Sequence, residues 1–250
     1  MPEKQSSEKL QKVLARAGVA SRRTVESWIH EGRIAVNGKT ARIGQRVTSK
    51  DKLSVDGQPV FIATEPEETR VIIYHKPVDE ICTRSDPEGR PTVFNALPTL
   101  YEGRWIGVGR LDINTSGLML FTNDGELANR LMHPSSGFAR EYAVRVLGNV
   151  TEDILDRLVK GVQLEDGVAR FEEIVVSGGR GANRWYHVVV MEGRHRMVRR
   201  LWESQDLQVS RLKRVRFGPI FLEASLAQGE WRDLLPAELQ KIKSLLSPSP

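Results

Sequence analysis

The stretch from Gly109 to Gly117 gathers the side chains best able to do chemistry: Arg110, Asp112, Asn114, Thr115 and Ser116. Its aspartate supplies one carboxylate, which could act as a nucleophile or as a proton acceptor. Apolar runs at residues 105–108 and 118–121 flank the stretch and predict two buried strands that the polar loop connects. Asp and Asn are also ordinary turn residues, so the loop by itself is compatible with a plain turn.

Two later segments carry further candidates. Residues 140–146 alternate as a strand with Tyr142 on its apolar face, where a lone tyrosine is usually a core residue. Residues 192–202 predict a glycine turn and then a helix that is rich in arginine: Arg194, Arg196, Arg199 and Arg200. Such cation density is costly unless phosphates or a buried carboxylate neutralise it. Arg199 is therefore the predicted partner of Asp112, with a basic surface helix as the alternative.

Composition indicates a soluble globular protein with a polyanionic partner. The chain has 250 residues, a net charge of +5 and no apolar run near the length of a membrane span. Residues 1–66 hold 12 Lys and Arg against 7 Asp and Glu, whereas the remainder holds 25 of each. The single cysteine, Cys82, favours a reducing cytoplasm, and the five histidines show no metal-ligand spacing.

The elements that must position these residues divide into two groups. Residues 7–32 predict two short helices capped by Ser7 and Ser21, and Asn37-Gly38 and Asp56-Gly57 each predict a hairpin turn. Residues 63–69 are polar and acidic and predict a linker. We therefore expect a domain at 1–66, with its core at about 8–62, and a second domain at 70–250.

The second domain resembles the pseudouridine synthases that modify ribosomal RNA. Gly-Arg-Leu-Asp at 109–112 with Thr-Ser-Gly-Leu at 115–118 resembles the signature loop of that family. Tyr74-His75-Lys76-Pro77 resembles its first motif, Arg140-Glu141-Tyr142 its tyrosine motif, and residues 193–199 its third motif. The resemblance implies an α+β fold: a mixed, mainly antiparallel sheet with flanking helices and a central cleft.

The same resemblance implies roles for the candidate residues. Asp112 would be the catalytic carboxylate, Arg199 would keep it ionised, and Tyr142 would stack on the uracil. Arg110 would occupy the space left by a flipped uridine. The isomerisation involves neither redox change nor net hydrolysis, so it demands no cofactor and no metal. A glycoside hydrolase would need a second carboxylate, which the loop does not offer.

The first domain resembles the S4 RNA-binding domain over about fifty residues. The matching residues are 10–23 and 32–38. In that family a helical face grips structured RNA through phosphates and shape. The predicted RNA contacts of the whole chain are Lys12, Arg16, Arg22, Arg23, Arg84, Arg90, Arg110, Arg194 and Arg196.

The segment Arg84–Phe94 resembles the branch of the family that modifies large-subunit ribosomal RNA. We therefore expect a cytoplasmic monomer that acts on 23S ribosomal RNA or a pre-ribosomal particle, at the B-type site. The alternatives are a synthase for small-subunit 16S RNA or for another large-subunit site, and a non-catalytic S4-type ribosome-assembly protein. Relatives often continue into a basic C-terminal tail, so the chain is expected to be short at this end.

Overall fold

The computed structural model describes the chain except for residues 1–6, 63–67, 102 and 247–250. The chain divides into two compact units. One comprises residues 1–69, 98–106 and 123–125, and the other comprises 70–97, 107–122 and 126–250. The expected domains did not include the segments 98–106 and 123–125 in the first unit. Most of the predicted linker and the last four residues lie outside the described residues.

The first unit begins with two helices. Strand β1 (Glu8–Lys9) leads directly into α1 (Leu10–Arg16), and α2 is Arg22–His30. The Ser21 hydroxyl accepts from the Thr24 N–H at 3.0 Å, which confirms the predicted second cap. The predicted Ser7 cap is wrong: Glu8 and Lys9 pair with strand β4, so the helix starts later and Lys9 is its N-cap.

Short strands complete this unit: β2 (Ile34–Val36), β3 (Lys39–Thr40), β4 (Arg46–Val47), β5 (Leu53–Val55) and β6 (Gln58–Val60). Their main sheet has the order β3-β2-β5-β6. Both predicted hairpin turns are present, with positive φ at Asn37, Gly38, Asp56 and Gly57. The helices pack on the strands through a core that includes Leu10, Leu14, Val25 and Ile34.

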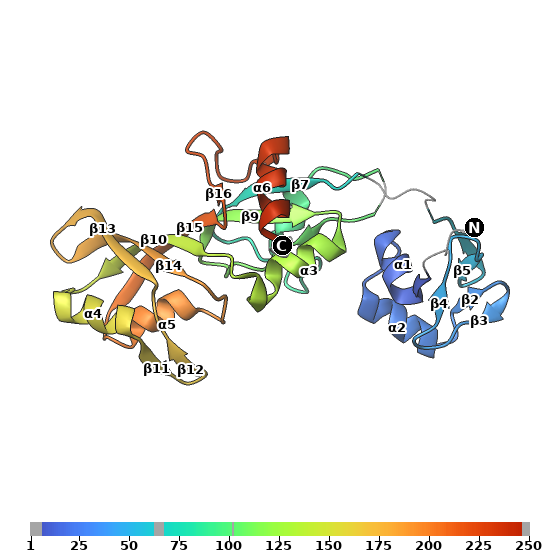
Figure 1. Ribbon diagram of the computed structural model, residues 1–250, viewed down its shortest axis with the longest axis horizontal. Helices are drawn as coiled ribbons and strands as arrows, with labels where there is room; N and C mark the ends of the chain where they lie inside the picture. Colours follow the sequence, from blue (N-terminus) through green and yellow to red (C-terminus); the bar gives the residue numbers. More distant parts are fainter. Residues whose placement is uncertain (1–6, 63–67, 102, 247–250) are drawn as a thin grey trace. The chain divides into compact units, whose positions relative to one another are not determined.

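The second unit is built on a long mixed sheet with the order β13-β14-β10-β15-β9-β7-β17 (Figure 1). Its strands are β7 (Val71–Lys76), β9 (Ser116–Thr122), β10 (Arg140–Leu147), β13 (Glu173–Arg180), β14 (Asn183–Val190), β15 (Gln208–Phe217) and β17 (Trp231–Asp233). Strand β8 (Ile106–Gly107) lies beside β9, and β16 (Ile220–Phe221) lies beside β15. Strands β15 and β9 are parallel and the other pairs of the main path are antiparallel, which confirms the mixed, mainly antiparallel sheet.

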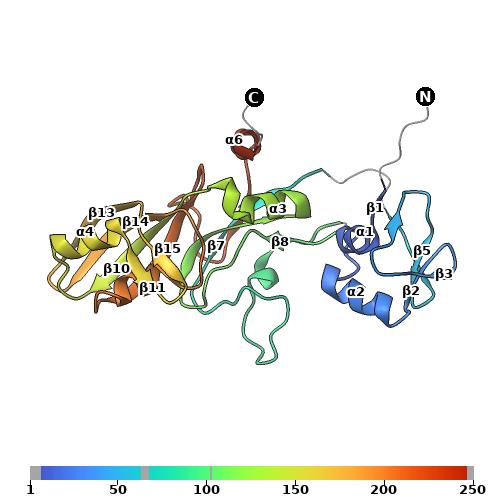
Figure 2. The same ribbon diagram turned by 60° about the horizontal axis from the view of Figure 1, so that its bottom comes forward.

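Helices flank this sheet, as expected. They are α3 (Gly125–Met132), α4 (Glu152–Lys160), α5 (Met197–Glu203) and α6 (Pro236–Leu246), with 3-10 turns η1 (Val93–Ala96) and η2 (Pro134–Ser136). A small hairpin of β11 (Val162–Leu164) and β12 (Gly167–Ala169) lies beyond α4. The segment between β7 and η1, drawn in teal, projects away from the sheet (Figure 2). None of the helices in the described ranges combines the length and apolarity that a membrane crossing requires.

The start of one helix differs from expectation. The helix expected to follow Gly193 directly begins at Met197, after Arg196 takes a left-handed conformation with φ of 49°. Val198, Leu201 and Trp202 of this helix are buried. Before strand β13, Phe171 donates its N–H to the Leu158 carbonyl at the end of α4.

Gly117 allows the sheet to form beside the signature loop. A Cβ atom there would lie 2.2 Å from the Arg214 carbonyl oxygen, and the φ of Gly117 is +114°. Strand β15 can therefore approach β9 only because this residue has no side chain. The glycine of the loop is thus required by the parallel pairing that ties the loop to the rest of the sheet.

Candidate active site

Asp112 lies half-buried in the loop that leads into β9. Its carbonyl oxygen accepts from the Thr115 N–H at 3.0 Å, so the backbone turns directly after it. Its carboxylate accepts no hydrogen bond from any residue that the structure describes. Arg110, two residues earlier, is exposed. The loop therefore combines a backbone turn that is fixed by a hydrogen bond with a carboxylate that accepts no hydrogen bond from the described residues.

A buried lysine fixes one side of this loop. Lys76 ends β7 with no exposed surface, and its ammonium donates to the carbonyl oxygens of Thr115 at 2.9 Å, Pro77 at 2.8 Å and Ile113 at 3.4 Å. Burial lowers the pKa of Lys76, and nearby acidic groups, Asp112 among them, act in the opposite direction. The lysine thus holds the residues that follow Asp112 and places a cation near the carboxylate.

Arg199 fixes the same loop from helix α5. Its side chain is 5% exposed, and it donates to the Asn114 carbonyl at 2.9 Å and to the Val209 carbonyl at 3.0 Å. It makes no ion pair with Asp112 within 4 Å, so the predicted partnership is not a direct contact, and only a longer-range Coulomb interaction relates the two groups. Burial and Arg196 lower the pKa of Arg199, and the charge of Asp112 raises it. Arg199 therefore links α5, β15 and the loop while keeping its charge near the carboxylate.

Cys82 touches the loop just before Asp112. Its thiol donates to the Leu111 carbonyl at 3.2 Å and lies 3.5 Å from the Met119 sulfur. Burial raises the pKa of this thiol, although Lys76, Arg214 and Arg110 oppose the shift. The thiol is therefore a neutral packing group that supports Leu111.

Tyr142 lies on β10, where it pairs with Arg214 of β15 and Val188 of β14. It is 8% exposed, and its hydroxyl has no hydrogen-bond partner among the described residues. Arg214 is 3% exposed and donates to the Leu118 carbonyl at 2.7 Å, while its Nη2 has no partner within the described ranges. Arg140 and Arg214 both lie over the Phe217 ring, at 5.3 and 5.6 Å. A buried aromatic face and an unused guanidinium donor therefore occur side by side on neighbouring strands.

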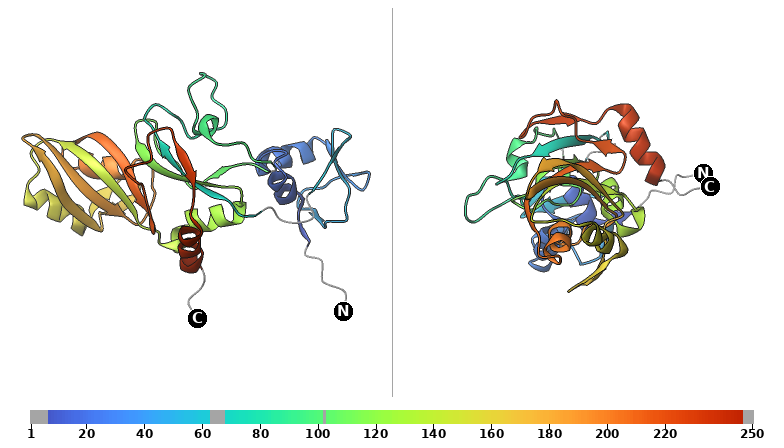
Figure 3. Two further views of the ribbon diagram at one scale, coloured as in Figure 1. Left: turned by 90° about the horizontal axis from the view of Figure 1, so that it is seen from above. Right: turned by 90° about the vertical axis from the view of Figure 1, so that its left-hand side faces the viewer.

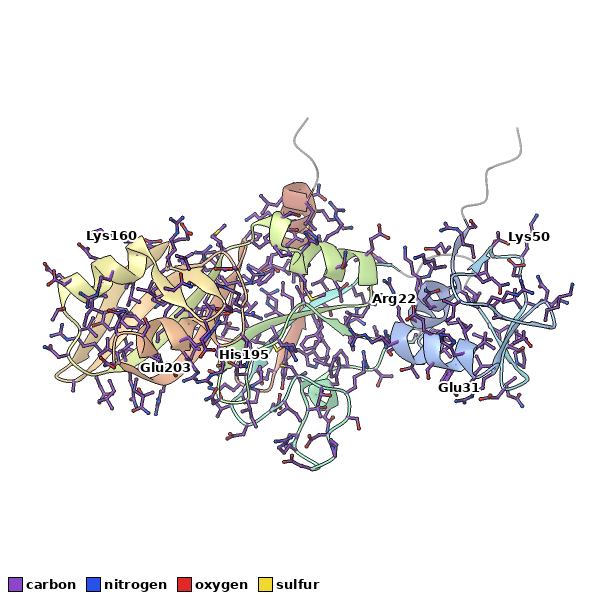
Figure 4. All side chains as sticks on the ribbon, turned by 90° about the horizontal axis from the view of Figure 1, so that it is seen from below. Arg22, Glu31, Lys50, Lys160, His195 and Glu203 are labelled. Atoms are coloured by element: carbon purple, nitrogen blue, oxygen red, sulfur yellow. The ribbon has the colours of Figure 1, made fainter. Side chains whose placement is uncertain are left out.

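The other arginines predicted to bind RNA in this unit differ in how their charge is used. Arg194 donates to Asp166, Glu192 and three backbone carbonyls around the β11–β12 turn, so both of its terminal nitrogens are occupied within the protein. Arg90 pairs with Asp86 and Glu88, and Arg196 pairs with Glu203. Arg84 lies over the Phe94 ring at 4.3 Å. His195, beside Arg196, is exposed before α5 (Figure 4).

The basic residues predicted on the first unit form two pairs. Lys12 and Arg16 both contact Glu8, at 3.1 and 2.6 Å. Arg22 and Arg23 are exposed in the first turn of α2, and neither makes an ion pair with a described residue (Figure 4). Arg22 instead lies near Arg104, whose pKa is lowered by burial and further by this like charge. Arg22 and Arg23 are thus the stronger candidates for phosphate contacts.

Sequence reasoning missed Lys76 and Arg214 as parts of the site. The signal for Lys76 was available: it ends a six-residue strand that is buried throughout, so its ammonium requires buried acceptors. Arg214 gave no comparable signal, because alternation along β15 does not distinguish a buried arginine from an exposed one. Within the described ranges no group of three or more His, Cys, Asp or Glu could hold a metal ion.

Comparison with known families identifies both units. The family described as RNA pseudouridylate synthase matches residues 70–204, and the S4 domain matches residues 8–53. A solved structure described as a pseudouridylate synthase aligns with a TM-score of 0.65 at 24% identity, covering 94% of this chain and 99% of that chain. That likeness supports the fold described above.

Curated relatives are similar over nearly the whole chain. The ribosomal large subunit pseudouridine synthase B of Pseudomonas aeruginosa is 63% identical over 234 residues, which cover 93% of this chain and 61% of the relative. The protein of the same name from Vibrio cholerae is 55% identical over 246 residues, covering 98% of this chain and 77% of the relative. The chain thus spans about three fifths of the length of the Pseudomonas protein.

Proposed function

Because the chain belongs to the RNA pseudouridylate synthase family and carries an S4 domain, we propose that it isomerises uridine to pseudouridine in large-subunit ribosomal RNA. The target is the uridine modified by the relatives named synthase B, to which this chain is 54–63% identical. The observation that carries the proposal is the loop of Asp112. Two buried cations hold the backbone that follows Asp112, and no donor of the described residues bonds to the Asp112 carboxylate.

The chemistry follows from what this loop can provide. In the reaction the bond from C1′ of the ribose to N1 of the uracil breaks, and a bond from C1′ to C5 forms. The C5 proton leaves and N1 gains a proton, so no oxidant, reductant or cofactor enters the balance. Asp112 acts at the ribose, either as the nucleophile at C1′ or as the base for the 2′ proton. Lys76 and Arg199 each interact with the charge of Asp112 and place positive charge near the reacting atoms.

The remaining residues hold the nucleoside. A uridine inside a stacked RNA must be flipped out to reach Asp112, and exposed Arg110 fills the position that it leaves. Tyr142 packs against the uracil while it is detached, and the free Nη2 of Arg214 donates to the nucleoside. Because both side chains are almost fully buried, the site also excludes water that would otherwise hydrolyse the intermediate.

The test is tritium release from large-subunit ribosomal RNA that carries 5-tritiated uridine. We expect Asp112→Asn to lower the rate at least about 10³-fold and to leave the RNA dissociation constant within about twofold. Asp206→Asn is the matched control, because this aspartate has a φ of 58° that asparagine tolerates. Substantial turnover by Asp112→Asn would refute the catalytic role. Absence of turnover in the unaltered protein, with tight binding, would favour the non-catalytic assembly protein instead.

A further inference from the structure

One part of the long sheet is covered by helices on one face only. Trp202 of α5 packs on Tyr186 of β14, with ring centroids 5.1 Å apart, and on Phe171, at 5.7 Å. Phe171 is joined to the end of α4 by its hydrogen bond to Leu158, so α4 and α5 share this side of the strands (Figure 3). Tyr142 lies on the same covered face, because Val144, two residues further along β10, pairs with Tyr186.

The opposite face of β13, β14, β10 and β15 is open. Val175 of β13 is 48% exposed, Arg211 of β15 is exposed, and the side chain of His187 is 38% exposed. Strand register places two rows of side chains here: Val175, His187, Ala143 and Lys213 in one, and Gly178, Trp185, Arg145 and Arg211 in the next. We call this surface the open face, defined by Arg145, Trp185, His187, Arg211, Lys213 and Arg216.

Cations outnumber acids on the open face. Glu141 and Glu173 share one row at its end, in register with Arg216, and among the described residues of the four strands they are the acids on this side. Glu141 accepts from Arg216 and His187, each at 2.7 Å. Arg211 and Lys213 make no ion pair and no side-chain hydrogen bond with the described residues, and Arg145 bonds only to Ser210. Their charges are therefore available to a partner.

We propose that the open face binds the phosphate backbone of a second segment of the ribosomal RNA, on the side of the sheet opposite Tyr142. This inference rests on the proposed function for the identity of the RNA. Arg145, Arg211 and Lys213 supply the phosphate contacts, because guanidinium groups match phosphate oxygens in geometry and charge. Trp185, in the same row as Arg145 and Arg211, offers a ring on which an unpaired base can stack.

The arrangement of these groups favours RNA over a protein partner. Arg211 and Lys213 are two residues apart on one strand, a separation of about 6.7 Å along the strand. Arg145 lies opposite Arg211 on the neighbouring strand, so the three cations can meet neighbouring charges of one nucleic-acid backbone. An acidic protein surface carries its charges without such a repeat.

The experiment compares Arg211→Gln/Lys213→Gln with a control, Lys160→Gln/Lys241→Gln, which removes two exposed cations. Lys160 lies at the end of α4 (Figure 4), and Lys241 lies on α6. Filter binding measures dissociation constants over a range of salt for two probes. One probe is a transcript of the complete large-subunit RNA, and the other is a short stem-loop that carries only the target uridine. For the complete transcript we expect roughly a tenfold weaker binding and a salt slope smaller by about two.

The other readouts separate this inference from the proposed function. We expect unchanged binding of the short stem-loop, an unchanged thermal midpoint, and an unchanged rate of tritium release at saturating RNA. Unchanged binding of the complete transcript would overturn the inference and direct the search to an acidic protein partner. An equal loss with the short probe, or with the control variant, would also overturn it. Failure of the unaltered protein to release tritium would refute the proposed function without deciding the binding result.

Discussion

The cations around Asp112 and those on the first unit are held in opposite ways. Lys76 and Arg199 are buried and donate to backbone carbonyls, with no carboxylate within 4 Å among the described residues. Lys12 and Arg16 are partly exposed and share Glu8, and Arg22 and Arg23 are exposed and have no acid partner in the part of the chain that the structure describes. A carbonyl oxygen accepts a hydrogen bond from a buried cation without neutralising its charge. The buried cations therefore keep a positive charge at a fixed position near Asp112. The exposed cations of the first unit can instead adjust their positions to bind RNA.

The substitution with the largest expected effect removes the buried ammonium of Lys76. Lys76→Met leaves the carbonyls of Pro77 and Thr115 without their donor inside the protein, so we expect the free energy of unfolding to fall by about 3 kcal/mol. Because the loop then shifts, the rate of tritium release should fall roughly 10²-fold. Chemical denaturation and kinetics measure both, with Lys241→Met as the exposed control. Normal stability and rate would show that the ammonium does not position the loop.

A smaller change keeps the charge at the second buried cation and alters its shape. Arg199→Lys cannot span both the Asn114 and the Val209 carbonyls, because an ammonium lacks the fork of a guanidinium. We expect kcat to fall roughly 10- to 10²-fold, with KM within about twofold. Measuring kcat and KM separately shows whether Arg199 acts in catalysis or in RNA binding. A raised KM with normal kcat would place Arg199 among the binding groups and end the contrast with the first unit.

The fixed half of this comparison was only partly predictable from the sequence. The loop, both flanking strands and the burial of Tyr142 follow from apolar runs and alternation, and the structure has them. The acceptors of Arg199 do not follow, because they are backbone groups at residues 114 and 209 that only the fold brings together. Local patterns indicate which apolar side chains are buried, but they do not show which distant carbonyl a buried cation contacts.

The predicted start of the first helix was wrong for a related reason. Ser7 is a good capping residue by type, yet the pairing of Glu8 and Lys9 with β4 moves the start of α1 to Leu10. Ser21, where no strand competes, caps α2 as its sequence predicts. Long-range pairing therefore overrode local preference at one cap and left the other intact.

The contribution of the exposed cations of the first unit to RNA binding is tested with variants of α2. Arg22→Gln/Arg23→Gln should weaken binding of large-subunit RNA roughly tenfold and reduce its salt slope by about two, with unchanged thermal stability. Lys12→Gln/Arg16→Gln is the matched comparison, and we expect a smaller change in slope because Glu8 already neutralises part of that charge. Filter binding at several salt concentrations measures both. Equal slopes for the two variants would contradict the distinction between paired and unpaired cations.

The smallest expected effect concerns Glu141. Its carboxylate, unlike that of Asp112, accepts hydrogen bonds from two side chains. Burial raises the pKa of Glu141, but hydrogen bonds from His187 and Arg216 outweigh it and leave the pKa below its ordinary value. A lowered carboxyl pKa contributes stability above the ordinary value near 4.5, and this is lost as the pH falls through the folded-state pKa. The contribution is at most about 1 kcal/mol for a pair this close to solvent. Glu141→Gln should therefore lower the thermal midpoint at pH 7 and lose that difference progressively as the pH falls from 4.5 through the lower folded-state pKa. A difference that does not change as the pH falls would mean that Glu141 stabilises the sheet by packing and not by its charge.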